Sequence, residues 1–264
     1  LIGVGRLGMA VGALLAGAGI RRVTATDPAR VEPHNLGESA CLSPDCLGES
    51  KVVAASQALR RRHPHLRVEA IAQSVTRGLA VSALRDADVL ICCADTDAAR
   101  LFTGIVAALY SKVLLDVGTG VFTAGAGTAP GADIRLIVPG RGCLLCAGGV
   151  ADLPAALKSL MSPGDENASQ GRDAWRQERA GSLASLNQVA AGLAVTLLEG
   201  LVQEKVTDST WVRVEMEANG LLQNRRIQPG ARPACPLCRC AGRGDAGLAA
   251  MPWILAQLRD QDQN

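Results

Sequence analysis

A glycine-rich turn close to the N-terminus constrains the fold of this chain more than any other feature. Residues 3–8 read Gly-Val-Gly-Arg-Leu-Gly, after an apolar pair and before a segment in which Ala and Leu recur with helical spacing. This order predicts a buried strand, a tight turn and a helix whose N-terminus can approach a phosphate group. The candidate nucleotide contacts in this turn are Gly3, Gly5, Arg6 and Gly8.

Strand and helix patterns then alternate, which predicts a parallel sheet covered by helices. Farther along, a long helix precedes two strands joined by an Asn-Gly hairpin turn, which indicates an antiparallel region. We therefore expect an α/β fold, with a Rossmann-like, doubly wound, mostly parallel sheet and C-terminal antiparallel strands. The expected strands are 23–26, 66–71, 89–93, 113–117, 134–138, 211–217 and 221–227, and the expected helices are 8–17, 51–62, 98–110 and 182–203.

The remaining segments show little periodicity. We expect a functional loop of about twenty residues after Asp27, because so long a loop is uncommon in a compact domain. Residues 163–181 are polar and predict a mobile crossover, and the last residues are weakly patterned. Residues 1–140 are expected to form the nucleotide-binding half, and 141–264 the zinc-knuckle, crossover and C-terminal strand region of the same domain. The chain opens inside a strand, so we expect a truncated stretch.

Composition excludes several partners. The net charge is only +2 and aromatic residues make up 2% of the chain, which argues against nucleic-acid binding. The longest apolar stretch, 189–198, is too short for a membrane span and contains a glycine. Two of the cysteine pairs have Cys-x-x-Cys spacing, which intracellular proteins use for metal or redox chemistry. These features favour a cytoplasmic protein without a membrane partner.

An acidic residue supports the nucleotide assignment. Asp27 ends the strand after the glycine turn and its helix, where a carboxylate can accept hydrogen bonds from ribose hydroxyls. The alternative interpretation is a tight turn followed by a helix cap. These residues do not distinguish ATP from NAD.

Three later segments resemble successive motifs of the ThiF/MoeB adenylyltransferase family. They are Asp27-Pro-Ala-Arg-Val-Glu-Pro-His-Asn35-Leu36, Gly48-Glu-Ser-Lys51 and Asp95-Thr-Asp-Ala-Ala-Arg100, in that order. The resemblance covers essentially the whole chain. The resemblance implies ATP as the nucleotide and Asn35, Lys51 and Asp95 as catalytic residues. Asn35 would position phosphates, Lys51 would neutralise the triphosphate and Asp95 would hold Mg²⁺, while Arg100 would support the loop of Asp95. Taken singly, the three catalytic candidates also suit a turn cap, a solvated lysine and a helix N-cap.

Two positions depart from the family pattern. Glu38 stands where the family has an arginine, and Ala29 replaces a second acidic residue. A carboxylate near the phosphates should weaken ATP binding, because like charges repel. Arg6 stands where the family has a glycine, and we expect it to compensate.

The two Cys-x-x-Cys pairs predict a zinc site. Each turn presents two thiolates, and two such turns complete a tetrahedral, closed and therefore structural site. Two unrelated thiol pairs or a redox pair remain alternatives, and Cys240 is a possible substitute ligand. The resemblance implies the same zinc knuckle. The predicted ligands are Cys143, Cys146, Cys235 and Cys238.

The other cysteines bear on the reaction. Some members of the family use a crossover-loop cysteine as a thioester nucleophile, but this chain has no cysteine between Cys146 and Cys235. Cys41 and Cys46 are weak candidates for that role, and Cys92 and Cys93 are expected in the core.

The resemblance implies ATP-dependent adenylation of the C-terminal carboxylate of a ubiquitin-like modifier or sulfur-carrier protein, by a homodimer. One alternative is a catalytically impaired scaffold subunit, motivated by Glu38 and Ala29. The other is an NAD-dependent oxidoreductase.

Overall fold

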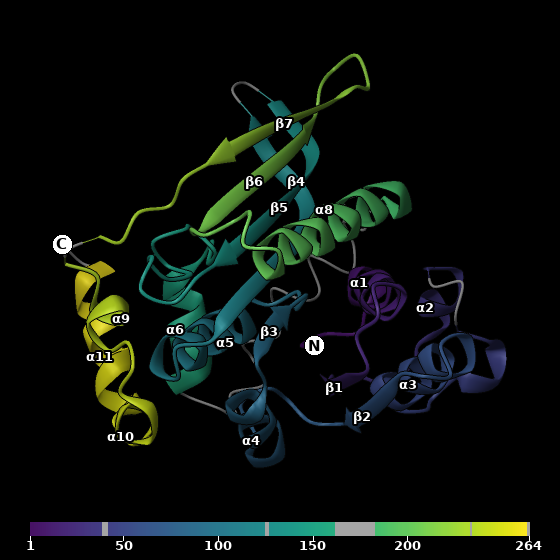
Figure 1. Ribbon diagram of the computed structural model, residues 1–264, viewed down its shortest axis with the longest axis horizontal. Helices are drawn as coiled ribbons and strands as arrows, with labels where there is room; N and C mark the ends of the chain where they lie inside the picture. Colours follow the sequence, from purple (N-terminus) through teal and green to yellow (C-terminus); the bar gives the residue numbers. More distant parts are fainter. Residues whose placement is uncertain (39–41, 125–126, 162–182, 233, 263–264) are drawn as a thin grey trace.

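The computed structural model describes the chain except residues 39–41, 125–126, 162–182, 233 and 263–264. The predicted crossover segment and Cys41 therefore lie outside the described residues. A twisted sheet runs through the molecule with helices on both faces, and its antiparallel strands extend beyond the helices as an arm (Figure 1). The α/β fold is confirmed.

The parallel part of the sheet is built as expected. Strand β1 (Arg22–Thr26) pairs in parallel with β2 (Arg67–Ile71), and β3 (Val89–Cys92) pairs in parallel with β4 (Val113–Ala124). Ile2 bridges both Thr26 and Cys92, also in parallel, and so connects the two pairs. The glycine turn therefore starts at the centre of the sheet.

The antiparallel part follows β4. Strand β5 (Gly127–Ile137) pairs with β4, β6 (Thr210–Met216) with β5, and β7 (Leu222–Ile227) with β6. Strands β4 and β5 are longer than predicted because they continue past the core as a hairpin, where no apolar run marks them. The turn before β7 contains Gly220 with φ 81°, a conformation that glycine adopts without steric cost.

Helices cover both faces of this sheet. Leu114 and Leu115 in β4 are both fully buried but belong to different apolar clusters, because successive residues of a strand point to opposite faces. Helices α1 and α8 pack on one face and α4 and α5 on the other. The helices flanking the sheet are α1 (Arg6–Gly17), α3 (Lys51–Arg62), α4 (Gly78–Asp86), α5 (Asp97–Leu109), α6 (Leu153–Met161) and α8 (Ala184–Val202).

Two segments that the sequence analysis left without assigned secondary structure contain helices. The loop after Asp27 contains α2 (Pro33–Glu38) and a 3₁₀ turn, η1 (Pro44–Cys46). The C-terminal region is helical, because weakly periodic residues there pack onto α5 and α6. Its helices are α9 (Pro236–Arg239), α10 (Gly244–Ala249) and α11 (Met251–Asp262).

Helix α8 is longer than the apolar stretch 189–198 that the sequence analysis judged too short for a membrane span. By length and composition alone it is sufficient to cross a membrane, and it is the one such helix in the described part of the chain. This is weak support for a membrane span, because core helices meet the same criteria. Its Ala190, Ala191 and Ala194 are fully buried against α1 and the sheet, as expected for a core helix.

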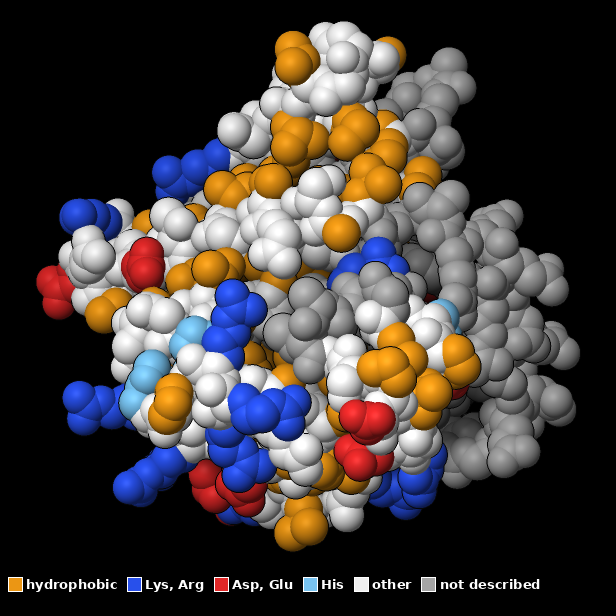
Figure 2. All heavy atoms as spheres, turned by 90° about the vertical axis from the view of Figure 1, so that its right-hand side faces the viewer, with side chains coloured by type: hydrophobic (Ala, Val, Ile, Leu, Met, Phe, Trp, Pro, Cys, Tyr) orange, Lys and Arg blue, Asp and Glu red, His pale blue; other side chains and the backbone are white. Residues whose placement is uncertain are grey.

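A basic surface lies on the edge of the molecule formed by α3, β1 and β2. Figure 2 shows Lys and Arg side chains gathered on the lower part of that face. They come from the last turn of α3 and the first residues of the two strands, where Arg22 and Arg67 are direct neighbours in register. The amino ends of β1 and β2 lie at the edge of the sheet opposite the carboxyl ends of the strands. The glycine turn and Asp27 follow those carboxyl ends, so the basic surface is separate from them.

Candidate functional site

The glycine turn is held by the strand next to it. Gly3 has φ 80°, and its amide donates to the carbonyl of Thr26 at 2.9 Å. The amide of Val4 donates to Oδ2 of Asp27 at 2.9 Å. The end of β1 therefore fixes the path of the chain into α1.

The three glycines of the turn differ in how much space a side chain would find at each position. A Cβ atom on Gly3 would lie 2.9 Å from the carbonyl oxygen of Cys93, and one on Gly8 would lie 2.1 Å from the carbonyl oxygen of Gly3. Both positions are therefore required by packing of the chain on itself. A Cβ atom on Gly5 would meet nothing within 4 Å. Gly5 leaves open space directly at the N-terminus of α1, which is where a phosphate is expected.

Asp27 is buried, and its carboxylate accepts hydrogen bonds from two backbone amides. Its Oδ1 accepts from the amide of Ala29 at 2.9 Å, while Oδ2 holds the amide of Val4. Each carboxylate oxygen can accept a second hydrogen bond. The predicted contact with ribose hydroxyls is therefore compatible with this geometry, and Asp27 also has a structural role that the sequence alone did not predict.

Lys51 is tied to the segment after Asp27 by a backbone hydrogen bond, whereas the side chain of Asn35 is held within its own loop. Lys51 begins α3, and its amide donates to the carbonyl of Ala29 at 2.9 Å. Asn35 is buried in α2, and its Oδ1 accepts from the amide of Glu32 at 3.0 Å. The segment between Asp27 and α3 thus folds back, so that the amide of Lys51 meets Ala29, which is two residues after Asp27. The side chain of Glu38 lies outside what the structure describes.

Asp95 follows β3 and is exposed. Among the described residues it makes no hydrogen bond or ion pair. The neighbouring Thr96 caps α5, because its Oγ1 accepts from the amide of Ala99 at 3.4 Å. Since the carboxyl ends of parallel strands share one edge of the sheet, the glycine turn, Asp27 and Asp95 all lie at that edge.

Arg100 does not support Asp95 through its side chain, contrary to our expectation. Its guanidinium pairs with the fully buried Asp116 at 2.6 Å and donates to the carbonyl of Val117 at 3.1 Å. Gly118 makes room for it, because a Cβ there would lie 2.6 Å from the guanidinium. The fully buried Asp116 carboxylate in β4 attracts Arg100 more strongly than the exposed carboxylate of Asp95 can, because water does not screen a buried charge.

Arg100 is one end of a buried charge network that the sequence analysis did not identify. Asp116 also pairs with Arg135 at 3.2 Å, and Arg135 pairs with Asp133 at 2.8 Å. Arg213 adds a two-pronged contact to Asp133, with both distances 2.8 Å. The sequence did contain a signal for this network, namely charged residues inside predicted strands. A buried charge needs a partner of opposite charge, so such residues indicate buried ion pairs.

Trp211 and the arginines fix the ionisation of Asp133. Burial opposes its charge, but hydrogen bonds from Arg213 and Trp211 and the charge of Arg135 outweigh burial and lower the pKa of the Asp133 carboxyl. The guanidinium groups of Arg135 and Arg213 also stack on the Trp211 ring, at 4.7 and 4.9 Å from its centroid. This network joins β4, β5 and β6 on the sheet face opposite α8.

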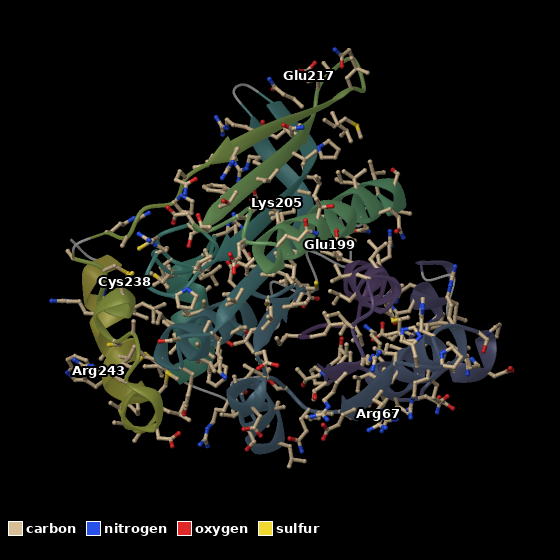
Figure 3. All side chains as sticks on the ribbon, viewed as in Figure 1. Arg67, Glu199, Lys205, Glu217, Cys238 and Arg243 are labelled. Carbon is tan, nitrogen blue, oxygen red and sulfur yellow. The ribbon has the colours of Figure 1, made fainter. Side chains whose placement is uncertain are left out.

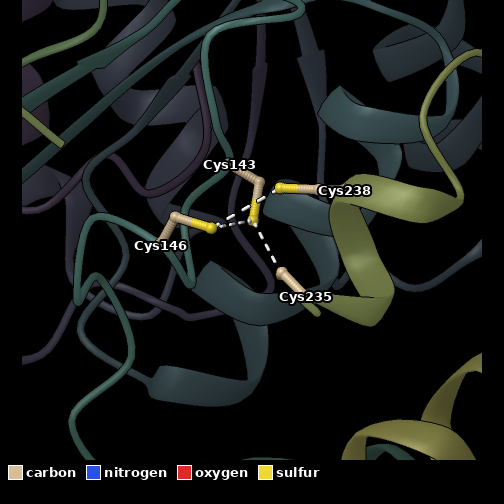
Figure 4. Close-up of side chains that lie close together, drawn as sticks. All are labelled: Cys143, Cys146, Cys235 and Cys238. Carbon is tan, nitrogen blue, oxygen red and sulfur yellow. Dashed lines mark hydrogen bonds between the residues drawn. The ribbon is translucent and has the colours of Figure 1, made fainter. Parts of the chain in front are cut away.

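The four predicted zinc ligands converge at one point. The sulfur of Cys143 lies 3.7 Å from that of Cys146 and 3.6 Å from that of Cys235, and Cys146 and Cys238 are 3.5 Å apart (Figure 4). Four sulfurs on a tetrahedron about 2.3 Å from a central zinc ion are about 3.8 Å apart. The donor set and the spacing therefore fit zinc.

Proton sharing within the cluster points to the same chemistry. A hydrogen bond from Cys143 lowers the pKa of Cys235, and the matching bond raises the pKa of Cys143. Thiolates are the form that binds a metal, and a divalent ion replaces the shared protons. Figure 3 shows Cys238 on α9, on the opposite side of the molecule from Arg67 in β2. In Figure 1, α9 and α1 lie on opposite sides of β3, so the cluster is separate from the glycine turn, and it joins the loop after β5 to the C-terminal helices.

The other cysteines that the structure describes lie outside this cluster. Cys240 is buried among apolar residues outside it, so it is not a substitute ligand. Cys46 is buried beside Val31, which leaves it in a small core rather than at the nucleotide edge. Cys92 is fully buried, as predicted, and burial raises its pKa to about 11.

Known proteins of similar sequence are adenylyltransferases. The chain is 31% identical over 115 residues to a sulfur carrier protein adenylyltransferase of Thermus thermophilus, an alignment that covers 44% of this chain and 42% of that protein. It is 30% identical over 115 residues to the adenylyltransferase and sulfurtransferase MOCS3 of Bos taurus, covering 44% and 25%. The chain thus spans less than half the length of these relatives.

Solved structures support the fold. The crystal structure of E. coli MccB with ATP matches with a TM-score of 0.63 and 19% identity, covering 90% of this chain and 64% of MccB. MccB bound to MccA-N7isoASN gives 0.65 and 21%, covering 90% and 66%. The model of the ThiF family matches residues 1–237, and this chain therefore belongs to the ThiF family.

Proposed function

We propose that this chain uses ATP to adenylate the C-terminal carboxylate of a ubiquitin-like modifier or sulfur-carrier protein. The observation that carries the proposal is the open space at Gly5, within a turn whose other glycines the chain needs for its own packing. A phosphate is the ligand that suits backbone amides at a helix N-terminus. The relatives of similar sequence are adenylyltransferases, which agrees with this chemistry.

The glycine turn and Asp27 would bind the nucleotide. Gly3, Gly5 and Gly8 allow the chain to pass close to the phosphates, and Arg6 begins α1 beside them. Arg6 supplies a positive charge that offsets the reversed charge of Glu38. Asp27 would accept hydrogen bonds from the ribose through lone pairs that the amides of Val4 and Ala29 leave available.

The catalytic residues would manage charge during the reaction. A carboxylate oxygen of the carrier attacks the α-phosphorus, the bond to the bridging oxygen breaks, and pyrophosphate leaves with that electron pair. Attack brings two anions together, so positive charge at the phosphates lowers the barrier. Lys51 would neutralise the triphosphate and Asn35 would orient it.

Asp95 is suited to hold a magnesium ion. Mg²⁺ takes oxygen ligands and is commonly held by one or two carboxylates together with substrate phosphates. Asp95 is exposed and without a hydrogen-bond or ion-pair partner among the described residues, which fits that donor set. A bound Mg²⁺ supplies charge neutralisation at the phosphates.

Zinc would have a structural role. Among the described residues, no other His, Cys, Asp or Glu joins the four-cysteine cluster, and a four-thiolate zinc site is closed to water. It would connect the C-terminal helices to the domain, distant from the nucleotide edge. We further propose a cytoplasmic homodimer that binds neither a membrane nor nucleic acid.

The reaction would stop at the acyl-adenylate or continue on a thiol elsewhere. The chain has no cysteine between Cys146 and Cys235, where some members of the family have a thioester nucleophile. The burial of Cys46 argues against that residue as a replacement.

A catalytically impaired scaffold subunit is the second candidate. Glu38 and Ala29 favour it, because both remove groups expected around the nucleotide. The two functions differ in pyrophosphate exchange. We expect the intact protein, given a cognate carrier ending in glycine, to exchange labelled pyrophosphate into ATP, and Asp95→Ala to abolish exchange. ATP binding without exchange for any carrier would favour the scaffold.

A further inference from the structure

The basic surface at the amino ends of β1 and β2 is made of arginines that converge from three elements. Arg22 and Arg67 are direct neighbours in the parallel register of the two strands, and the amide of Arg67 donates to the carbonyl of Arg21 at 2.8 Å. The short loop 63–66 joins the last turn of α3 to Arg67, so the arginines of that turn lie at the same edge. The side chains that form the surface are all exposed: Arg21, Arg22, Arg60, Arg61, Arg62 and Arg67.

These side chains have no acidic partner in the part of the chain that the structure describes. None of them forms an ion pair there. Arg60 donates to the carbonyl of Ser56 at 3.3 Å, within its own helix. Glu69 follows Arg67 by two positions on β2, but its Oε2 accepts from Oγ1 of Thr24 at 3.3 Å. The positive charge of the basic surface is therefore available to another molecule.

Part of this arrangement reduces the stability of the free protein. Cations in the last turn of a helix are favourable, because the carbonyl end of a helix carries a partial negative charge. This accounts for the arginines of α3. It does not account for Arg22 and Arg67, which face each other on neighbouring strands, where like charges are destabilising. Groups that lower stability are commonly retained at functional sites, so this pair indicates an anionic partner.

Apolar side chains beside the arginines indicate that the partner is a protein. Nε2 of His65 lies 3.1 Å from the carbonyl oxygen of Ala16, so the end of α1 meets the loop that leads to Arg67. Leu14 in α1 and Ile20 after it are each 39% exposed. Exposed apolar groups next to arginine, with lysine absent, are typical of protein interfaces. The net charge of only +2 and the low aromatic content disfavour nucleic acid.

We propose that the basic surface binds an acidic, extended segment of another protein. Guanidinium groups recognise carboxylates through two-pronged hydrogen bonds. Neighbouring strands are about 4.8 Å apart and packed layers about 10 Å apart, so the surface is roughly 15 Å across. An extended segment of about five residues covers that distance. An apolar residue beside its acidic run contacts Leu14 and Ile20.

This binding site goes beyond the proposed function and does not depend on it. The glycine turn and Asp27 lie at the opposite edge of the sheet, so the segment and a nucleotide can be bound at the same time.

Fluorescence anisotropy with a labelled peptide, a leucine followed by a run of glutamates, measures this binding. We expect saturable binding at low salt that weakens as salt screens the charges. The same peptide with glutamines in place of the glutamates should not bind. Serine in place of the leucine should weaken binding roughly three- to tenfold, because the apolar contact is lost.

Three charge reversals locate the site on the protein. Arg61→Glu and Arg67→Glu each reverse one charge of the basic surface and should weaken binding of the glutamate peptide roughly five- to tenfold. Arg243→Glu changes the net charge equally and is the matched control, because Figure 3 shows Arg243 on the opposite side of the molecule from Arg67. It should change the affinity less than about twofold. Arg67→Glu places a carboxylate beside Arg22, so its Tm should not fall, and pyrophosphate exchange should be unchanged.

Three results would overturn the inference. One is that the unmodified protein does not bind the glutamate peptide at low salt. Another is equal weakening by all three reversals, which would show that net charge alone matters. The third is tighter binding of single-stranded DNA of equal charge, or of vesicles containing phosphatidylserine, which would assign the surface to another class of partner. Failure of the proposed function would appear instead as absent pyrophosphate exchange, with peptide binding intact.

Discussion

Gly8 offers the most demanding test of how the glycine turn is built. Gly8→Ala adds one methyl group to a buried position in the first turn of α1. That carbon would lie 2.1 Å from the carbonyl oxygen of Gly3, whereas non-bonded carbon and oxygen atoms approach no closer than about 3 Å. The oxygen belongs to the backbone of the turn, so the turn or the helix must shift.

The magnitude follows from two opposing terms. Alanine in place of glycine within a helix stabilises by roughly 0.5–1 kcal/mol. Overpacking in a close-packed region costs roughly 1–3 kcal/mol, and contact with backbone places this site toward the upper end. We expect the free energy of unfolding to fall by about 1–2 kcal/mol, which lowers Tm by roughly 2–8 °C for a domain of this size.

Thermal unfolding followed by circular dichroism, with zinc present at a fixed concentration, measures this change. Gly5→Ala is the matched control, because a methyl group there meets nothing within 4 Å and the backbone angles are φ −67° and ψ −165°. Its Tm should stay within about 2 °C of the unmodified protein, while its affinity for MgATP falls. A Gly8→Ala protein as stable as the original would refute the packing argument, and undiminished ATP binding by Gly5→Ala would refute the placement of the phosphates.

The supporting parts of the fold give three further predictions. Cys235→Ser should reduce bound zinc from one equivalent to substoichiometric levels by elemental analysis, and a full equivalent retained in this variant would contradict the cluster. Asp116→Asn leaves Arg100 and Arg135 facing a neutral amide, so the free energy of unfolding measured in urea should fall by about 3–5 kcal/mol. A fall of less than about 1 kcal/mol would show that the buried ion pairs contribute little to stability. The folded pKa of Asp133 is lowered from 3.8, so its ionised form stabilises the protein above that value and the benefit is lost as pH falls through the folded pKa. The stability advantage over Asp133→Asn should therefore be constant above about pH 5 and shrink in more acidic solution; an advantage that grows there would show that the sign is wrong.

Much of the parallel sheet could be predicted because its signals are local. Lys51 begins its helix as expected, since the preceding loop residues cannot continue a helix and the apolar residues after it recur at helical spacing. Asp27 follows Val-Thr-Ala-Thr, a short run rich in β-branched residues, which suits a strand. The cysteine pairs were predictable for a similar reason, because metal ligand spacing within a turn is set by the turn itself.

The remainder depends on contacts between distant residues. Asp116, Arg135 and Arg213 lie in three different strands, and nothing in their spacing states which charge meets which. The C-terminal helices bury their apolar residues against α5 and α6, which are far away in the sequence.

The most direct test of the account is calorimetric titration of the zinc-loaded protein with MgATP, MgGTP and NAD, repeated on Asp95→Ala and Lys51→Ala. The account predicts saturable binding of ATP in preference to the other two nucleotides, weakened by both substitutions in proteins whose Tm is unchanged. Preferential binding of NAD, or ATP affinity unaffected by both substitutions, would contradict the assignment of an adenylation site to the carboxyl edge of this sheet.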